Sequence, residues 1–224
     1  MKNIAIIGAG LIGRSWAIVF ARAGYPVMLY DNVDGAVTKA VALISHGLAD
    51  LKEYGLIDED PLTILSRITP AQSLEEAVSS AFYVQENTSE NIDMKKEVFK
   101  TLDSLAPEKC ILASSTSTIQ TSLFSEHLEG RHRCIVAHPV NPPHIAPIVE
   151  VSPAPWTSPE ITKRTYDLHQ LVGQAPIIVK KEVAGFILNR LQAALLREAW
   201  RLVDEDYVSV EDLDKTIKDG LGLR

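Results

Sequence analysis

Apolar runs of strand length alternate with longer segments of helical spacing along the chain as far as residue 180. Residues 2–7 form a nearly continuous apolar run, which is typical of a strand buried on both faces of a sheet. Strands that alternate with helices predict an α/β fold in which helices cover both faces of a doubly wound, mainly parallel sheet. The predicted strands are 2–7, 27–30, 81–84, 110–113, 134–138, 147–151 and 176–180, and the predicted helices are 14–23, 35–54, 61–66, 91–105, 118–128 and 158–172.

The pattern changes near residue 184. Apolar residues from Phe186 to Val203 recur at helical spacing with no strand between them, and a further helix is predicted over 210–218 with Ser209 as its N-cap. We therefore predict two domains, residues 1–183 and residues 184–224. Two helices are too few for an independent core, so they are expected to pack on the first domain, on another chain or on a part that is absent here.

Composition narrows the classes of function. A net charge of −7 argues against binding to nucleic acid or acidic membranes, because both reward clustered Lys and Arg side chains. No apolar run reaches the length that spans a membrane. Cys110 and Cys134 each open an apolar run and are expected to be reduced and buried. The default expectation is a soluble, cytoplasmic protein.

A glycine-rich turn follows the first predicted strand and opens the first predicted helix. Gly8 permits the tight turn, Gly10 lets backbone N–H groups approach a pyrophosphate, and Gly13 lets the helix pack on the strand. Asp31 ends the next strand, where its carboxylate can accept the ribose hydroxyls of NAD and repel the 2′-phosphate of NADP. The alternative is a glycine-rich turn beside an incidental acid. The predicted NAD contacts of this segment are Gly8, Gly10, Leu11, Ile12, Gly13 and Asp31.

A histidine and a glutamate lie twelve residues apart in two neighbouring apolar runs. His138 ends the run 134–137 and enters a proline-rich loop, and Glu150 lies inside the run 148–151. A His oriented by a carboxylate can act as a general base near neutral pH, whereas the alternative is a solvated turn between strands. His144 could join them around a metal ion, but no metal is predicted because hydride transfer to NAD needs none. The remaining histidines, His46, His127, His132 and His169, are expected at the surface or at helix ends.

Four hydroxyl residues, 114–117, follow the predicted strand 110–113. Doubly wound sheets bind ligands at the carboxyl ends of their strands, so one hydroxyl could donate to a substrate oxygen. Alternatively, Ser117 or Thr118 caps the next helix. A nucleophilic role for Ser117 is disfavoured, because no Gly-x-Ser-x-Gly elbow surrounds it.

Four motifs occur in order: Ser-Ser-Thr-Ser at 114–117, His-Pro-Val-Asn-Pro-Pro at 138–143, Val-Glu-Val at 149–151 and Ala-Gly-Phe-Ile-Leu-Asn-Arg at 184–190. Together they resemble the 3-hydroxyacyl-CoA dehydrogenase superfamily. The sequences of segments 136–143 and 181–186 look most like its lambda-crystallin branch, the L-gulonate 3-dehydrogenases. The resemblance runs along the chain in one register. It implies a Rossmann-type domain and NAD-linked oxidation of a secondary alcohol at carbon 3 of an acid. It also implies a larger all-α C-terminal domain that forms a homodimer, of which this chain would carry only the first two helices, so that the domain is apparently truncated.

The resemblance also implies roles for individual residues. His138 would be the general base and Glu150 the carboxylate that orients it. Ser117 and Asn189 would hold the reacting oxygen or the imidazole, with Ser117 serving cofactor, substrate and catalysis alike. Asn141 would lie beside the nicotinamide.

Three charged residues complete the set. Glu90 and Lys95 match a cofactor-side acid and base of the superfamily, although from sequence alone they could be a solvated helix start. Arg224 matches an arginine of the sugar-acid branch and could pair bidentately with a substrate carboxylate.

Three functional interpretations remain open. The first is an L-gulonate-like sugar-acid dehydrogenase. The second keeps the chemistry but acts on a 3-hydroxyacyl-CoA or on carnitine, although only Lys52 and Arg67 are basic near 45–70, which favours a small free acid over CoA. The third is a non-catalytic, crystallin-like structural protein that still binds NAD(H).

Overall fold

The computed structural model describes residues 3–223. Eight strands form one sheet in the order β3-β2-β1-β4-β5-β6-β7-β8, in which every neighbouring pair is parallel except the antiparallel pair β6 and β7. The predicted doubly wound, mainly parallel α/β fold is confirmed. The strands are β1 (Asn3–Ile7), β2 (Val27–Tyr30), β3 (Ile68–Pro70), β4 (Ala81–Glu86), β5 (Ile111–Ser114), β6 (Cys134–Pro139), β7 (Ile148–Pro153) and β8 (Ala175–Ile178).

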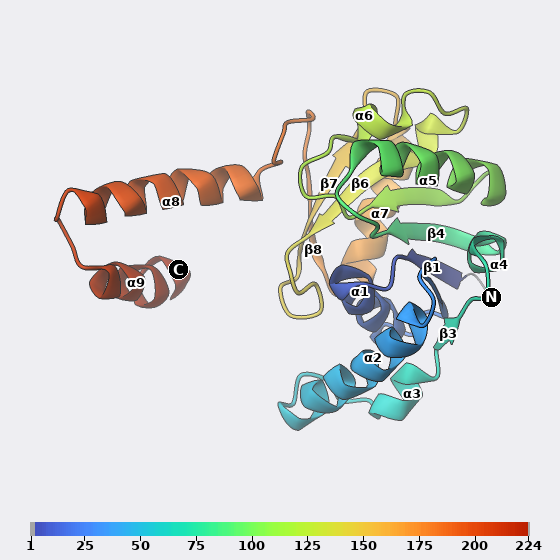
Figure 1. Cartoon of the computed structure of the whole chain (residues 1–224), viewed down its shortest axis with the longest axis horizontal. Helices are drawn as coiled ribbons and strands as arrows, with labels where there is room; N and C mark the ends of the chain where they lie inside the picture. Colours follow the sequence, from blue (N-terminus) through green and yellow to red (C-terminus); the bar gives the residue numbers. More distant parts are fainter. Residues whose placement is uncertain (1–2, 224) are drawn as a thin grey trace. The chain divides into compact units, whose positions relative to one another are not determined.

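Helices cover both faces of this sheet (Figure 1). On one face, α1 and α7 meet through Trp16 and His169, whose ring centroids lie 5.1 Å apart. On the other face, α5 and α6 meet through Phe99 and Phe124, at 4.4 Å. The helices of this part are α1 (Leu11–Arg22), α2 (Ala36–Glu53), α3 (Pro61–Leu65), α4 (Leu74–Val78), α5 (Ile92–Leu105), α6 (Thr121–Ser125) and α7 (Pro159–Leu171), with a 3₁₀ turn at Arg131–Arg133.

Strand order reverses between β1 and β4, so the carboxyl ends of these two strands border a switch point, where doubly wound sheets bind their ligands. The central strands β1, β5 and β6 are buried along their whole length, whereas the edge strand β3 is largely exposed. Cys110 and Cys134 are buried and unbridged, as predicted. Burial raises the pKa of Cys110 to about 12.

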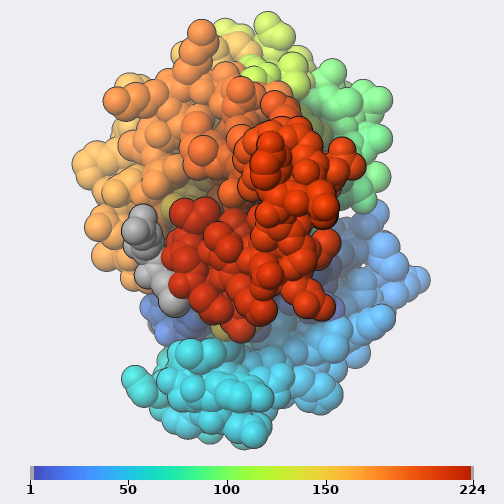
Figure 2. Space-filling model, turned by 90° about the vertical axis from the view of Figure 1, so that its left-hand side faces the viewer, coloured from blue at the N-terminus to red at the C-terminus, as the bar shows by residue number. Residues whose placement is uncertain are grey.

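Several short elements differ from the sequence-based expectations. The strand β3, which has three residues and ends in a proline, and the helix α4, which has five residues, were not predicted, although the equally short α3 was. Proline is tolerated there since β3 is an edge strand. The helix expected over 118–128 is confined to α6, because side chains hold the preceding residues in a loop. Figure 2 shows α3, in cyan, packed beside α2, in light blue.

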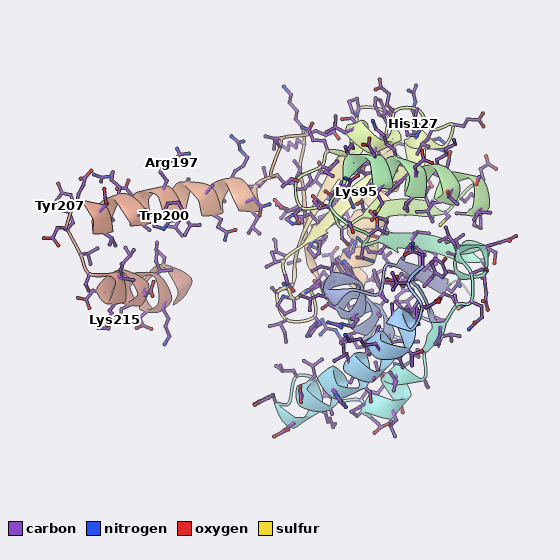
Figure 3. The ribbon with its side chains drawn as sticks, in the orientation of Figure 1. Lys95, His127, Arg197, Trp200, Tyr207 and Lys215 are labelled. Carbon is purple, nitrogen blue, oxygen red and sulfur yellow. The ribbon has the colours of Figure 1, made fainter. Side chains whose placement is uncertain are left out.

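The chain divides into two compact units, Met1–Ala184 and Gly185–Arg224. The second unit consists of α8 (Leu188–Asp204), α9 (Val210–Asp219) and a 3₁₀ turn at Leu221–Leu223. The side chain of Ser209 accepts a hydrogen bond from the Asp212 N–H and caps α9, as predicted. On α8, Trp200 lies on the side that faces α9, and Arg197 lies on the opposite side (Figure 3). None of the helices in the described part of the chain has the length and apolar character needed to cross a bilayer.

Candidate active site

The glycine turn joins β1 to α1 at the switch point of the sheet. Gly8 has a φ of +92°, and a Cβ at this position would lie 2.7 Å from the carbonyl oxygen of Asn87. A Cβ on Gly13 would lie 1.9 Å from the carbonyl oxygen of Gly8. Backbone packing therefore requires glycine at both positions: the first because of the turn, the second because the helix runs so close to the strand end.

Gly10 is different, because open space surrounds it. A Cβ built on Gly10 would meet no atom of the described structure within 4 Å. Helix α1 begins at the next residue, and within the described chain its N-terminus has no side-chain cap. The N–H groups of Leu11, Ile12 and Gly13 have no intrahelical acceptor at this end of the helix, so they suit an anionic group such as a pyrophosphate.

Asp31 lies at the end of β2, next to this turn. Its Oδ2 accepts a hydrogen bond from the N–H of Ala9 at 2.7 Å, and its Oδ1 accepts one from the N–H of Val33 at 2.9 Å. The carboxylate therefore holds the glycine turn against the end of β2. Each carboxylate oxygen has more than one acceptor site, so both can also accept ribose hydroxyls.

A groove of about 650 Å³ runs beside these residues. Gly8, Gly10 and Asp31 line it together with Asn87 and Thr88 from the loop after β4. The open position at Gly10, the uncapped helix and the acid at the end of β2 fit a dinucleotide whose pyrophosphate crosses the turn and whose adenosine lies beside Asp31.

His138 and Glu150 face one another across β6 and β7. They are directly opposite in the antiparallel register, and His138 Nδ1 lies 2.8 Å from Glu150 Oε2. Both side chains are buried, with 6% and 1% of their surface exposed. Because a carboxylate only accepts hydrogen bonds, the proton of a neutral His138 ring belongs on Nδ1, and the Nε2 atom carries the lone pair.

Glu90 joins two loops at the carboxyl edge of the sheet. Its Oε1 accepts hydrogen bonds from the Thr116 hydroxyl at 2.6 Å and from the N–H groups of Ser117 and Thr118, both at 3.0 Å. Partial burial alone would raise the pKa of Glu90, but these hydrogen bonds and the nearby Lys95 ammonium lower it below its usual value. Glu90 therefore fixes the backbone of Ser117.

Lys95 is buried and bound to a carboxylate that the sequence reasoning missed. Its Nζ lies 3.0 Å from Glu86 Oε1 and 3.9 Å from Glu90 Oε2. Glu86 is itself fully buried and also accepts hydrogen bonds from Thr88 and Ser114. With 1% of its side chain exposed, Lys95 can reach a ligand only by leaving Glu86, so the geometry supports a role for Lys95 through the two glutamates. The sequence feature that could have identified Glu86 as a site residue is its position at the carboxyl end of β4.

The other expected site residues are each placed within their own unit. Asn141 is exposed in the loop between β6 and β7, and Asn189 is the second residue of α8, in the second unit. Ser117 is exposed in the loop after β5. The expectation for Arg224 falls outside the described residues.

His169 lies in the last turn of α7, at a helix end as expected, but it is not a surface residue. It is fully buried, and its Nε2 lies 2.9 Å from the Tyr83 hydroxyl. Burial lowers the pKa of His169 to about 3. The burial of His169 could not be predicted from the helical spacing of α7, because its partner Tyr83 lies on β4, far away in the sequence. No cluster of three or more potential metal ligands occurs among the residues that the structure describes.

Comparisons with known proteins agree with this geometry. Residues 3–183 match the NAD binding domain of 3-hydroxyacyl-CoA dehydrogenase, and residues 185–224 match the C-terminal domain of the same family. Lambda-crystallin of Oryctolagus cuniculus is 43% identical over 227 residues, which cover 99% of this chain and 70% of the relative. An L-carnitine dehydrogenase of Oceanobacillus iheyensis is 35% identical, covering 100% of this chain and 72% of the relative.

Solved structures show the same fold. The crystal structure of (S)-3-hydroxybutyryl-CoA dehydrogenase from Ralstonia eutropha superposes with a TM-score of 0.90 at 30% identity, covering 99% of this chain and 78% of that one. These matches confirm the resemblance inferred from the motifs, including its lambda-crystallin branch. They also confirm NAD as the cofactor. The chain belongs to the 3-hydroxyacyl-CoA dehydrogenase family of NAD-dependent oxidoreductases.

Proposed function

We propose that the chain oxidises the 3-hydroxyl of a small, L-gulonate-like hydroxy acid to the 3-keto acid, with His138 as the general base. The observation that carries this proposal is the buried pair of His138 and Glu150, joined at 2.8 Å. With Nδ1 donating to the carboxylate, the ring accepts the proton of the substrate hydroxyl at Nε2. Glu150 then stabilises the imidazolium that forms.

NAD, when bound, accepts the hydride from the substrate carbon. The chain supplies the binding and the orientation. Gly10 and the N-terminus of α1 hold the pyrophosphate, Asp31 holds the adenosine ribose, and Asn141 lies at the nicotinamide end. Ser117 and Asn189 orient the reacting oxygen, and Arg224 pairs with the carboxylate of the substrate.

The charges near α2 and α3 favour a small free acid over an acyl-CoA. Lys52 donates through its Nζ to the carbonyl oxygen of Asp58 at 2.6 Å. Arg67 forms a bidentate pair with Glu59 at 2.5–2.6 Å and also donates to the carbonyl oxygen of Ala21. Both basic residues of the segment 45–70 are therefore engaged within the fold. A CoA phosphate would have to displace these contacts.

Two alternatives make different predictions. A 3-hydroxyacyl-CoA or carnitine dehydrogenase would keep the same base and cofactor but prefer another substrate. A crystallin-like structural protein would bind NADH without turnover, and the buried His138–Glu150 pair disfavours it because an unused buried ionisable pair costs desolvation energy.

A homodimer and a cytoplasmic location stay predictions.

The decisive experiment is a substrate panel. L-gulonate, 3-hydroxybutyryl-CoA and L-carnitine are each incubated with the protein and NAD, and NADH formation is followed by its absorbance. We expect the highest kcat/KM with L-gulonate. Preference for either other compound would select the second interpretation, and NADH binding without turnover of any compound would select the third.

His138→Asn tests the mechanism. The variant keeps a polar side chain of similar size but cannot take up a proton, so kcat should fall by about 10²–10⁴. NADH affinity, measured by fluorescence, should stay close to that of the unmodified protein. His127→Asn, at the surface near α6 (Figure 3), is the control and should leave kcat unchanged. Full activity of His138→Asn would remove His138 from the mechanism.

A further inference from the structure

Ser115 lies at the centre of a hydrogen-bond network beside the proposed site. Its hydroxyl oxygen accepts from the indole N–H of Trp16 at 3.0 Å and from the side-chain amide of Gln85 at 2.7 Å. The same hydroxyl donates to Asn87 Oδ1 at 2.7 Å. We propose that Ser115 is a positioning residue that fixes the strand bearing His138 relative to the glycine turn. The proposal rests on the proposed function, because it assigns Ser115 an effect on the general base.

One branch of the network reaches the glycine turn. The side-chain amide of Asn87 donates to the carbonyl oxygen of Ile7 at 3.2 Å, and its backbone N–H donates to the same oxygen at 2.7 Å. Ile7 immediately precedes Gly8, and the carbonyl oxygen of Asn87 is the atom that excludes a Cβ there. A change at Ser115 should therefore alter the position of Asn87 and, through it, the glycine turn.

The other branch reaches the strand that carries His138. The ladder between β5 and β6 ends at the pair Ser114 and Val136. The next carbonyl of β6, that of Ala137, accepts from the Gln85 side chain at 3.2 Å. Gln85, on β4, thus reaches across the end of β5 and holds the residue adjacent to His138.

The direction of each hydrogen bond is determined. The Ala137 carbonyl only accepts, so it must face the NH₂ group of Gln85, and Gln85 Oε1 then accepts from the Tyr83 hydroxyl at 2.6 Å. Because the hydroxyl proton of Tyr83 is donated to Gln85, His169 Nε2 must donate to the Tyr83 oxygen. Ser115 likewise uses its one proton and both of its lone pairs. A network with no spare donor or acceptor at its centre has one arrangement, which suits it to positioning.

The test compares Ser115→Ala with Ser125→Ala. Ser125 is a matched control, because its buried hydroxyl accepts from the indole of Trp156 at 3.1 Å and donates to the Thr121 carbonyl, on α6. We expect Ser115→Ala to lower kcat at saturating NAD by about ten- to a hundredfold, and Ser125→Ala to leave it unchanged. Ser115→Thr, which restores the hydroxyl, should recover most of the loss.

His138→Asn is assayed alongside to separate the two hypotheses. If His138→Asn is inactive while Ser115→Ala matches Ser125→Ala, the positioning role is wrong and the proposed function stands. If His138→Asn is fully active, the proposed mechanism is wrong, and the positioning role is then decided by a readout that needs no turnover.

That readout is the NMR signal of the tryptophan indole N–H groups. NADH binding at the glycine turn should shift the signal of Trp16, which is bound to Ser115, and leave that of Trp156, bound to Ser125, in place. In Ser115→Ala the Trp16 signal should already be displaced and respond little to NADH. Equal responses of the two indoles in the unmodified protein would overturn the proposal whatever the activity data show.

Discussion

His169 shows what a buried neutral imidazole does to stability. The ring is fully buried against Trp16, Phe20 and Tyr83. Its pKa is lowered from 6.5 to about 3 by burial. Below pH 6.5 the His169 imidazole is protonated in the unfolded chain, whereas in the folded chain it stays neutral until the pH approaches 3. Folding stability is therefore lost as the pH falls through this window and is unaffected by His169 above it.

His169→Phe should remove this acid sensitivity. Each pH unit between the two pKa values is worth about 1.4 kcal/mol, so from pH 6.5 to 5 the unmodified protein should lose about 1–2 kcal/mol more than the variant. Urea unfolding at several pH values measures this difference. His46→Phe, on α2, is the control. Equal pH slopes for the unmodified protein and His169→Phe would show that His169 is protonated in the folded state.

Single residues were predictable from sequence where their neighbours in the chain carried the signal. His138 and Glu150 stood out because polar residues interrupt two apolar runs. His169 and Glu86 did not, because each depends on contacts with elements distant in sequence. The four consecutive hydroxyl residues at 114–117 could be placed at a strand end from sequence, but their separate partners could not be predicted. Ser114 binds Glu86, and Ser115 binds three side chains.

The glycine turn is the element whose sequence and structure correspond most directly. Gly13 is required by a backbone contact inside the fold, whereas Gly10 faces open space. The same motif therefore contains one glycine needed for folding and one needed for binding. That division gives the two positions separable phenotypes.

Gly10→Ala should fold and fail to bind. Its φ of −68° suits alanine, so the free energy of unfolding should change by no more than about 1 kcal/mol, while NADH affinity falls because the methyl group enters the space of the pyrophosphate. Gly13→Ala should lose about 1–3 kcal/mol of stability through overpacking as well as affinity. Gly47→Ala, where a Cβ would make an ordinary contact at 3.7 Å, is the matched control. Thermal unfolding and NADH titration test all three, and tight NADH binding by Gly10→Ala would contradict the role of this position.

Elements longer than about ten residues were predicted nearly at their observed bounds, because several turns of helical spacing define them. Among the short elements, β3 and α4 were missed and α6 was predicted too long, whereas β2 and α3 were predicted within one residue of their observed bounds. The helix expected over 118–128 fails at its start because Thr116 Oγ1 accepts from the Ile119 N–H, and Glu90 holds the same loop. Such contacts arise from the loop after a different strand and leave no local pattern.

At the scale of the molecule, the sheet and the His138–Glu150 pair lie within the first compact unit, Met1–Ala184. A chain ending at Ala184 should therefore unfold cooperatively and bind NADH with an affinity close to that of the longer chain. It should lack turnover, because the proposed substrate contact Asn189 is removed. Circular dichroism and NADH fluorescence check the first two expectations. Loss of NADH binding would show that residues 185–224 contribute to the cofactor site.

The antiparallel pairing of β6 and β7 has a consequence for redesign. Histidine and glutamate sit opposite one another by virtue of strand register, so the eight residues between the two strands, 140–147, do not set their spacing. Residues 142–147 can therefore be lengthened, shortened or exchanged to suit a bulkier or smaller acid, as long as the two strands stay aligned and Asn141, the proposed nicotinamide contact, is kept. A slip of a single position along either strand would do more harm than replacing residues 142–147, since it would turn one member of the pair to the opposite side of the sheet.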